Sequence, residues 1–389
     1  MTPEARVSAA IGVIDQIMAG AHVGRVLTAW GRANRYAGSG DRAAIADHVY
    51  EVLRRRRSLA ALGGGCSGRC LMLGLLRANG QDPAAIFSGA RFAPPPLTEA
   101  ERVAGQSPAS DSAEDLDLPD WVLPLFRAAL GAQAEAVARA LSQRAEVHLR
   151  VNLARIGRED ARAVLAAEGV ETTPHPLSPT ALTVRTGARR LRNAAPYRDG
   201  RVELQDAASQ AVADMVPLTA GQSLLDYCAG GGGKTLAVAG RVRGRFFAHD
   251  AVPARMGDLP SRAERAGQTV HLLETTGLVE KAPYDTVLVD APCSGSGSWR
   301  RDPQGKWHLT REGLDRLCVT QADILRRAAD LVAPGGHLVY ATCSLLDPEN
   351  GDQVDRFLAG HPEFEAVAQR ALTPLDGADG FFCAVLARK

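Results

Sequence analysis

No stretch of the sequence reaches the roughly 18 consecutive apolar residues that a transmembrane helix needs, so we expect no membrane-spanning segment. The first thirty residues carry charges and a helical period without an apolar core segment, and they do not predict a signal peptide. Cysteine is sparse as well: seven residues, an odd number spread over 389, favour free thiols in a reducing compartment. Together these absences predict a cytoplasmic protein.

An excess of charge of either sign is also lacking. The 45 basic residues balance 44 acidic ones, so the net charge of +1 gives no sign of a nucleic-acid partner. Only four of the basic residues are lysines, an arginine bias that is typical of a GC-rich genome. Hydrophobic residues at 46% and charged residues at 23% are ordinary values that exclude a disordered, collagen-like or coiled-coil chain. The length of 389 residues predicts two or three domains.

The first two regions of the chain differ in their hydrophobic pattern. Residues 1–145 repeat apolar positions at helical spacing, as in Val7, Ile11 and Ile14, and predict an all-helical domain. Residues 146–204 predict a small α+β module, with a strand through Leu149, a helix over 158–168 and short strands around Leu182 and Leu191.

This module carries a local basic stripe. No acidic residue occurs between positions 172 and 198, whereas five arginines do: Arg185, Arg189, Arg190, Arg192 and Arg198. Such a stripe can meet phosphate groups, or it can be a solvated basic face, and the sequence leaves both interpretations open.

Residues 205–389 alternate apolar strands with helices. A helix is expected over 206–216, and the expected strands are 223–228, 246–250, 269–274, 286–290, 337–343 and 380–388. Apolar strands separated by helices predict an α/β fold with a doubly wound parallel sheet, which binds ligands at the carboxyl ends of its strands.

A run of glycines follows the first of these strands, in Cys228-Ala-Gly-Gly-Gly-Gly-Lys-Thr235. Glycines at a strand-to-helix turn let the backbone approach a ligand closely. A phosphate-binding P-loop would need Gly where Cys228 stands, and no start within the run satisfies the dinucleotide fingerprint Gly-x-Gly-x-x-Gly. The run therefore predicts a ligand other than a nucleotide held by its phosphates.

Two acids flank this run. Asp226 precedes it, and Asp250 closes the next strand, where a carboxylate can accept both hydroxyls of a ribose. S-adenosylmethionine carries a ribose and no phosphate, so it suits such a site. The competing interpretation of Asp250 is a helix cap before Pro253.

Two cysteines lie at the ends of later strands, Cys293 in Asp290-Ala-Pro-Cys-Ser and Cys343 in Tyr340-Ala-Thr-Cys-Ser. A lone cysteine in a strand is usually inert core, but two at the same edge of a sheet beside a cofactor site indicate chemistry. Methylation at carbon 5 of a pyrimidine needs such a thiol. A thiolate that adds to carbon 6 makes carbon 5 nucleophilic, and a carboxylate on the cytosine amino edge stabilises the adduct.

These motifs resemble the Sun-type RNA cytosine carbon-5 methyltransferases, and among them most the bacterial RsmB type that acts on 16S ribosomal RNA. The matching stretches are Gln205–Gln210, Asp226–Thr235, Asp290–Gly297, Arg300-Arg301 with Lys306-Trp307, Tyr340–Ser344 with Pro348–Asn350, and Gly380–Phe382. The pattern of Asp41–Arg57 is similar to the helical NusB-like domain of RsmB-type enzymes. The resemblance implies a Rossmann-like catalytic domain at 205–389, a small linker module at 146–204 and an RNA-binding NusB-like domain at 1–145.

The resemblance also implies roles for individual residues. Cys343 would be the nucleophile, Cys293 would assist product release, and Asp290 would bind the base. The cofactor would be held by Cys228, Ala229, Gly230, Gly231, Gly232, Gly233, Lys234, Asp250 and Asp290. Two positions depart from the family: Gly230-Gly231 replaces Ala/Ser-Pro, and Glu274 is the only acid where the family has an adenine-binding Asp after the third strand.

Other functions fit the motifs less well. A DNA cytosine methyltransferase would make Cys293 the attacker, and an enzyme that methylates exocyclic amines would have Asp/Asn-Pro-Pro-aromatic at Asp290. A transfer RNA substrate, or a non-catalytic ribosomal RNA-binding assembly factor, remains the alternative. Cys66 and Cys70 have no neighbouring His or Cys to complete a metal site, so no bound metal is expected. We also expect the protein to be a monomer.

Overall fold

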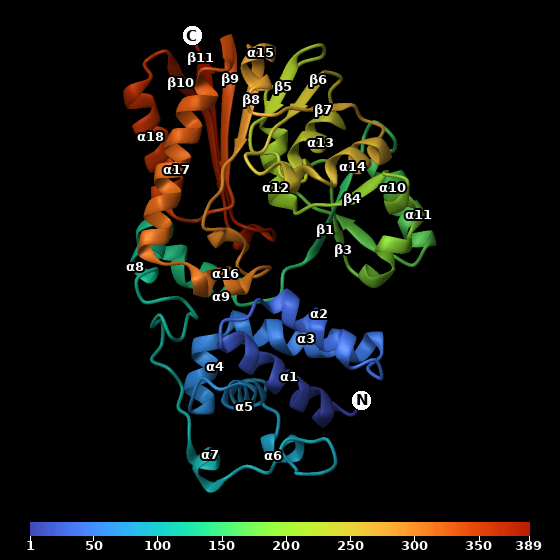
Figure 1. Cartoon of the computed structure of the whole chain (residues 1–389), viewed down its shortest axis with the longest axis vertical. Helices are drawn as coiled ribbons and strands as arrows, with labels where there is room; N and C mark the ends of the chain where they lie inside the picture. Colours follow the sequence, from blue (N-terminus) through green and yellow to red (C-terminus); the bar gives the residue numbers. More distant parts are fainter. The chain divides into compact units, whose positions relative to one another are not determined.

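The computed structural model describes all 389 residues, and they form two compact units (Figure 1). One unit combines Met1–Arg144 with Trp299–Leu309, and the other combines Ala145–Ser298 with Thr310–Lys389.

The first unit is helical, as predicted. Its core joins Val7 and Ile14 of the first helix to Ile45 and Val49 of the third and Leu71 of the fifth, all of them buried. Thr2 begins the first helix by accepting a hydrogen bond from the Ala5 N–H, as an N-cap does. The helices are α1 (Pro3–Met18), α2 (Val23–Ala33), α3 (Ser39–Arg54), α4 (Arg56–Gly63), α5 (Gly68–Ala78), α6 (Pro83–Ile86), α7 (Glu99–Val103), α8 (Leu123–Leu130) and α9 (Ala134–Leu141).

A distant part of the sequence completes this unit. Helix α16 (Pro303–His308) satisfies carbonyl groups at the end of α3: Lys306 Nζ donates to Arg54 O at 2.9 Å, and Trp307 Nε1 donates to Leu53 O at 2.6 Å. The last carbonyls of a helix have no partner within it, so these donors cap α3. Lys306 and Trp307 therefore pack in the helical unit, although their motif was expected to belong to the catalytic domain.

The second unit contains a four-stranded sheet with the strand order β2-β3-β1-β4 and antiparallel pairing throughout. Leu191 was expected in a strand, which was wrong: it lies in the short 3-10 helix Ala188–Asn193, where it is buried against Leu149. The elements are β1 (Val147–Val151), α10 (Arg158–Ala167), β2 (Thr172–Pro174), β3 (Ala181–Val184), α11 (Ala195–Arg198) and β4 (Val202–Leu204).

The same unit contains a seven-stranded sheet, in the order β10-β11-β9-β8-β5-β6-β7. The predicted doubly wound α/β arrangement is confirmed for its five parallel strands, β5 to β9. These are β5 (Ser223–Asp226), β6 (Arg245–Ala248), β7 (Val270–Leu272), β8 (Tyr284–Asp290) and β9 (Val332–Thr342). The helices between and beside them are α12 (Ala207–Asp214), α13 (Gly233–Ala239), α14 (Leu259–Ala266), α15 (Gly277–Lys281), α17 (Arg311–Ala329) and α18 (Gly351–Gly360).

The sheet is parallel except at one edge. Strand β11 (Phe381–Arg388) runs antiparallel to β9 and pairs with β10 (Phe364–Leu372), which the sequence analysis did not predict. Seven of the nine residues of β10 are exposed, so this edge strand lacks the buried alternation by which strands are recognised.

Helices cover both faces of this sheet (Figure 1). Leu224, Leu288 and Val339 pack with α12 and α13, whereas the alternate residues Leu225, Val287 and Tyr340 pack with α17 and α18. This alternation buries the central strands on both sides and leaves the strand ends as the place for a site.

No single helix of the chain has the length and apolar character to cross a membrane. Helices α4 and α5 meet the length and composition criteria only as a pair bent by 91°, and Leu71, Met72 and Leu73 of α5 are buried in the protein.

Candidate active site

Four loops meet at the carboxyl ends of parallel neighbouring strands. They follow β5, β6, β8 and β9, and they carry the glycine run, Asp250, Cys293 and Cys343 respectively. The predicted site residues therefore lie at one edge of one sheet.

The glycine run forms the turn from β5 into α13. Gly230 and Gly232 have φ angles of +50° and +72°, which favour glycine over residues with a Cβ. Asp250 holds the start of this turn, because its carboxylate accepts hydrogen bonds from Gly230 N at 3.0 Å and Val252 N at 2.9 Å. The Asp250 side chain thus shapes the loop, a contact that the sequence did not indicate.

Asp226 sits beneath the loop at the end of β5. Its Oδ2 accepts a hydrogen bond from Thr235 Oγ1 at 2.6 Å, while its Oδ1 is buried without a partner. Burial, together with the nearby Asp290 charge, raises the pKa of Asp226 to about 7.

These features fit S-adenosylmethionine. The unpartnered Asp226 oxygen offers an acceptor to a donor group, and a Cβ at Gly230 would meet nothing within 4 Å, so open space adjoins the loop. The buried Asp250 carboxylate has further lone pairs for ribose hydroxyls.

Lys234, at the end of the glycine run, contacts Asp290, the last residue of β8 and the predicted base-binding residue. Its Nζ donates to Asp290 Oδ2 at 2.6 Å, and it also lies 4.9 Å from the centre of the Phe381 ring. Burial disfavours the lysine charge, but the Asp290 carboxylate outweighs burial and raises the pKa of Lys234 above its ordinary value. Lys234 was expected only to bind the cofactor, and its contact with Asp290 is new.

The two thiols face each other, with Cys293 Sγ and Cys343 Sγ 3.4 Å apart. The hydrogen bond from Cys293 lowers the pKa of Cys343 against the effect of burial, and Lys234 and Ser298 lower it further. The same contact, with burial, raises the pKa of Cys293. The thiolate of the pair is therefore favoured on Cys343.

A buried carboxylate connects the two cysteine loops. Glu349 Oε1 accepts from Ser294 N at 2.7 Å and Gln321 Nε2 at 3.0 Å, and its Oε2 accepts from the hydroxyls of Ser294 and Ser344. Ser294 and Ser344 each follow a cysteine directly. The local sequence around Glu349 did not indicate this role, although Glu349 stands in the matching stretch Pro348–Asn350.

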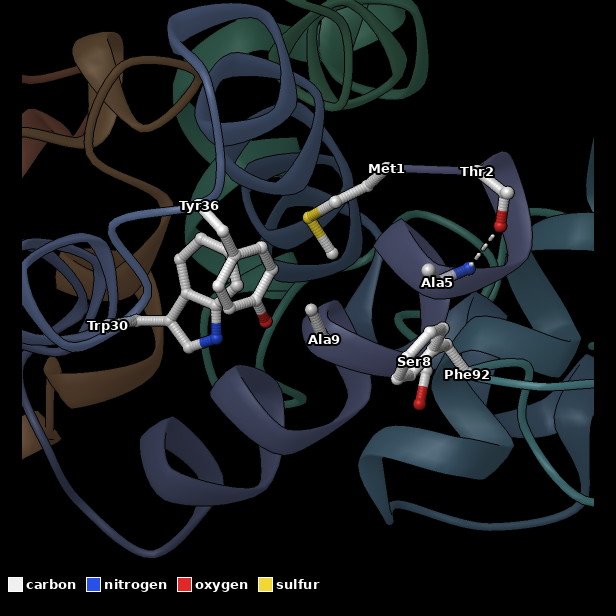
Figure 2. Close-up of a pocket in the computed structure, with 8 residues that line it drawn as sticks. All are labelled: Met1, Thr2, Ala5, Ser8, Ala9, Trp30, Tyr36 and Phe92. Carbon is white, nitrogen blue, oxygen red and sulfur yellow. Dashed lines mark hydrogen bonds between the residues drawn. The ribbon is translucent and has the colours of Figure 1, made fainter.

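Other parts of the chain do not join this site. Glu274, the weak candidate for adenine contact, is exposed after β7. A cavity of about 710 Å³ in the helical unit is lined by Trp30 and Tyr36 on one side and by Ser8 and Phe92 on the other (Figure 2). It contains none of the predicted site residues. No cluster of three or more His, Cys, Asp or Glu side chains is arranged to hold a metal.

Two family models match regions of the chain. The family described as 16S rRNA methyltransferase RsmB/F matches residues 214–386, and the RsmF/B-like ferredoxin-like domain matches residues 118–189. The chain belongs to the RsmB/F methyltransferase family. The resemblance seen in the sequence motifs is thereby confirmed.

Individual relatives extend the match beyond the catalytic sheet. Ribosomal RNA small subunit methyltransferase B of Klebsiella pneumoniae (strain 342) is 33% identical over 287 residues, which cover 70% of this chain and 66% of that protein, slightly under two thirds of its length. The crystal structure of PH0851 covers 99% of both chains with a TM-score of 0.77 at 22% identity. A methyltransferase homolog from Pyrococcus horikoshii covers 72% of this chain and 98% of its own, with a TM-score of 0.64 at 22% identity. These two structures support the Rossmann-like fold.

Proposed function

We propose that this protein transfers a methyl group from S-adenosylmethionine to ring carbon 5 of a cytosine in RNA, and that the substrate is 16S ribosomal RNA. One observation carries the chemistry: two thiols 3.4 Å apart lie at the strand ends that also hold the Lys234–Asp290 ion pair and the glycine loop. The family match and the relative named ribosomal RNA small subunit methyltransferase B support the substrate.

In this proposal Cys343 is the nucleophile. Its thiolate bonds to carbon 6 of the cytosine, which pushes electron density onto carbon 5. Asp290 accepts a hydrogen bond from the amino group of the base, and Lys234 orients the Asp290 carboxylate through their 2.6 Å contact. S-adenosylmethionine supplies the methyl group that carbon 5 takes up.

Cys293 acts after methylation. A base takes the carbon 5 proton, and we assign this role to a water molecule at the site. The electron pair of the broken C–H bond reforms the double bond between carbons 5 and 6, and the bond from carbon 6 to Cys343 Sγ breaks to release the thiolate. Because Cys293 Sγ lies 3.4 Å from Cys343 Sγ and has a raised pKa, it is a protonated thiol that stabilises the leaving thiolate by a hydrogen bond.

RNA docking is assigned to the basic stripe and to the helical domain at 1–145. All five stripe arginines are exposed; Arg185 is paired with Glu146 at 2.7 Å, whereas Arg189, Arg190, Arg192 and Arg198 make no ion pair. Arginines without acidic partners keep their charges available for phosphate groups. We place the protein in the cytoplasm, since all seven cysteines are free, as in a reducing compartment. We propose that it acts as a monomer.

The test is methyl transfer from tritiated S-adenosylmethionine to unmodified 16S ribosomal RNA, followed by mapping of 5-methylcytosine. We expect one or a few cytosines to be labelled by the wild type and none by Cys343→Ser. Labelling of transfer RNA instead would overturn the assignment of 16S ribosomal RNA as the substrate. RNA binding without any labelling would favour the alternative function, a non-catalytic assembly factor.

A further inference from the structure

Two arginines outside the proposed cofactor site hold carbonyl groups of the glycine loop. Arg262 on α14 donates through Nη1 to Gly231 O, and Arg150 on β1 donates through Nη1 to Gly233 O at 2.8 Å. Arg150 is only 4% exposed. Since β1 belongs to the four-stranded sheet, that sheet contacts the loop directly.

One carboxylate connects these arginines. Glu203 lies directly opposite Arg150 on β4, and its Oε2 accepts from Arg150 Nη2 at 2.7 Å. Its Oε1 accepts from Arg262 Nε at 2.7 Å and from Arg265 Nη2 at 3.0 Å. The space enclosed by this network measures about 10 Å³, enough for no more than one water molecule. The network leaves little free space around Glu203, although the Arg262 and Arg265 side chains are partly exposed.

The carbonyl contacts add to the restraint that Asp250 places on the start of the loop at Gly230 N. Four consecutive glycines lose more conformational freedom on ordering than any other sequence of that length. Because a peptide group is planar, fixing Gly233 O also fixes the direction of the Lys234 N–H. That N–H lies in the first turn of α13, where backbone donors have no partner within the helix.

We propose that Arg150, Glu203 and Arg262 are positioning residues that hold the glycine loop in the shape that binds S-adenosylmethionine. The four-stranded sheet is then part of the cofactor site and not only a linker or an RNA-docking module. This inference rests on the proposed function in that it takes the ligand of the loop to be S-adenosylmethionine.

Arg265 provides a matched control. Arg262 and Arg265 both donate to Glu203 Oε1, but only Arg262 also reaches a loop carbonyl. Removal of either arginine takes one positive charge from Glu203. Only removal of Arg262 should loosen the loop.

The experiment uses the full chain and calorimetric titration with S-adenosylmethionine. We expect Arg262→Ala and Arg150→Met to raise the Kd by about 10- to 100-fold, the range for a lost charged hydrogen bond, and Arg265→Ala to change it less than about twofold. In steady state the KM for S-adenosylmethionine should rise with kcat nearly unchanged. Kd values for Arg150→Met and Arg262→Ala that equal the value for Arg265→Ala would overturn the proposal.

A second substitution tests the loop itself. A Cβ at Gly231 would lie 2.6 Å from Arg262 Nη1, so Gly231→Ala displaces this guanidinium in the wild type but fits once Arg262 is Ala. Because Ala restricts the backbone, Gly231→Ala should tighten binding in the Arg262→Ala background and weaken it in the wild type. The same sign in both backgrounds would contradict the proposal.

Hydrogen exchange of residues 229–236 in the free protein separates this proposal from the proposed function. We expect exchange about tenfold faster in Arg150→Met and Arg262→Ala than in Arg265→Ala. If the wild type bound no S-adenosylmethionine, the proposed function would fall, and the exchange rates would still decide whether the arginines order the loop.

Discussion

Cys293 Sγ and Cys343 Sγ lie 3.4 Å apart although 50 residues separate them in the chain. The contact exists because β8 and β9 are parallel neighbours, and each cysteine follows the carboxyl end of its strand. The two thiols differ in pKa: the hydrogen bond from Cys293, with Lys234 and Ser298 nearby, lowers the pKa of Cys343, whereas the pKa of Cys293 is raised.

The first prediction separates the roles of these thiols. Cys343→Ser should abolish methylation and the covalent RNA adduct, because a hydroxyl is a far weaker nucleophile than a thiolate. Cys293→Ala should allow attack and methyl transfer but hinder release, so protein and RNA accumulate as a complex that survives a denaturing gel. A retarded band with Cys343→Ser and none with Cys293→Ala would reverse the assignment.

The second prediction concerns Asp250, in the loop after β6. Asp250→Ala should weaken S-adenosylmethionine binding by about 10- to 100-fold, because it removes charged hydrogen bonds to the ribose and to Gly230 N. Calorimetry measures the loss, with Asp258→Ala, an exposed acid nearby, as the control. Unchanged affinity in the folded Asp250 variant would refute the assignment.

The third prediction tests whether Glu349 sets the spacing of the cysteine loops. Glu349→Gln removes the charge and replaces the acceptor of the Ser294 and Ser344 hydroxyls by an amide N–H₂, which can only donate to them. Weaker neutral hydrogen bonds then hold the two loops less firmly. We expect the single-turnover rate of adduct formation to fall by about 10- to 100-fold, since a small misplacement of reacting groups costs this much. Affinity for S-adenosylmethionine should stay within twofold of the wild type.

Glu280→Gln, on an exposed position of α15, is the matched control for the same chemical change and should leave the rate unaltered. An adduct rate for Glu349→Gln equal to that of this control would show that Glu349 does not position the thiols.

The fourth prediction is a pH dependence of stability. Burial raises the pKa of Asp226 to about 7 from its ordinary value of 3.8, so the folded protein binds this proton more tightly than the unfolded chain does. The contribution of Asp226 to the free energy of unfolding is therefore full below about pH 4 and is lost as the pH rises through 7. Asp226→Asn has no such titration.

Urea unfolding at pH 5 and pH 8 measures this effect. Between pH 5 and pH 8 the wild type should lose about 2–3 kcal/mol of unfolding free energy relative to Asp226→Asn. Asp355→Asn, at an exposed position, should show no such movement. A difference that is independent of pH for Asp226→Asn would contradict the buried, proton-binding state.

The fifth prediction concerns RNA docking. Arg189 and Arg192 lie three residues apart in a 3-10 helix and project to the same side. Replacing both by Ala should weaken RNA binding and reduce the slope of log K against log salt by about 1.5, because two phosphate contacts are lost. Arg326 and Arg327 on α17, which pair with Asp323, are the matched double control. An unchanged salt slope would exclude the stripe from RNA contact.

The sequence by itself determined the sheet and most of the site. Apolar strands, a strand-to-helix glycine run and residues at strand ends follow local periodicity, and parallel strands bring their carboxyl ends to one edge whatever the rest of the chain does. Asp290, Cys293 and Cys343 could be placed together for this reason. Strand β10 was not predicted, because an exposed edge strand lacks the alternation of buried and exposed residues by which strands are recognised.

Only the tertiary structure decided contacts between residues whose elements are distant in sequence. Nothing in the local pattern around Arg150 indicates that it reaches Gly233 O, 83 residues away, or that Lys306 caps α3 from 252 residues away. These side chains are buried polar groups, and a buried donor must find an acceptor wherever packing brings one. Periodicity reports which face of an element is buried, whereas packing alone selects the partner that each buried charge meets.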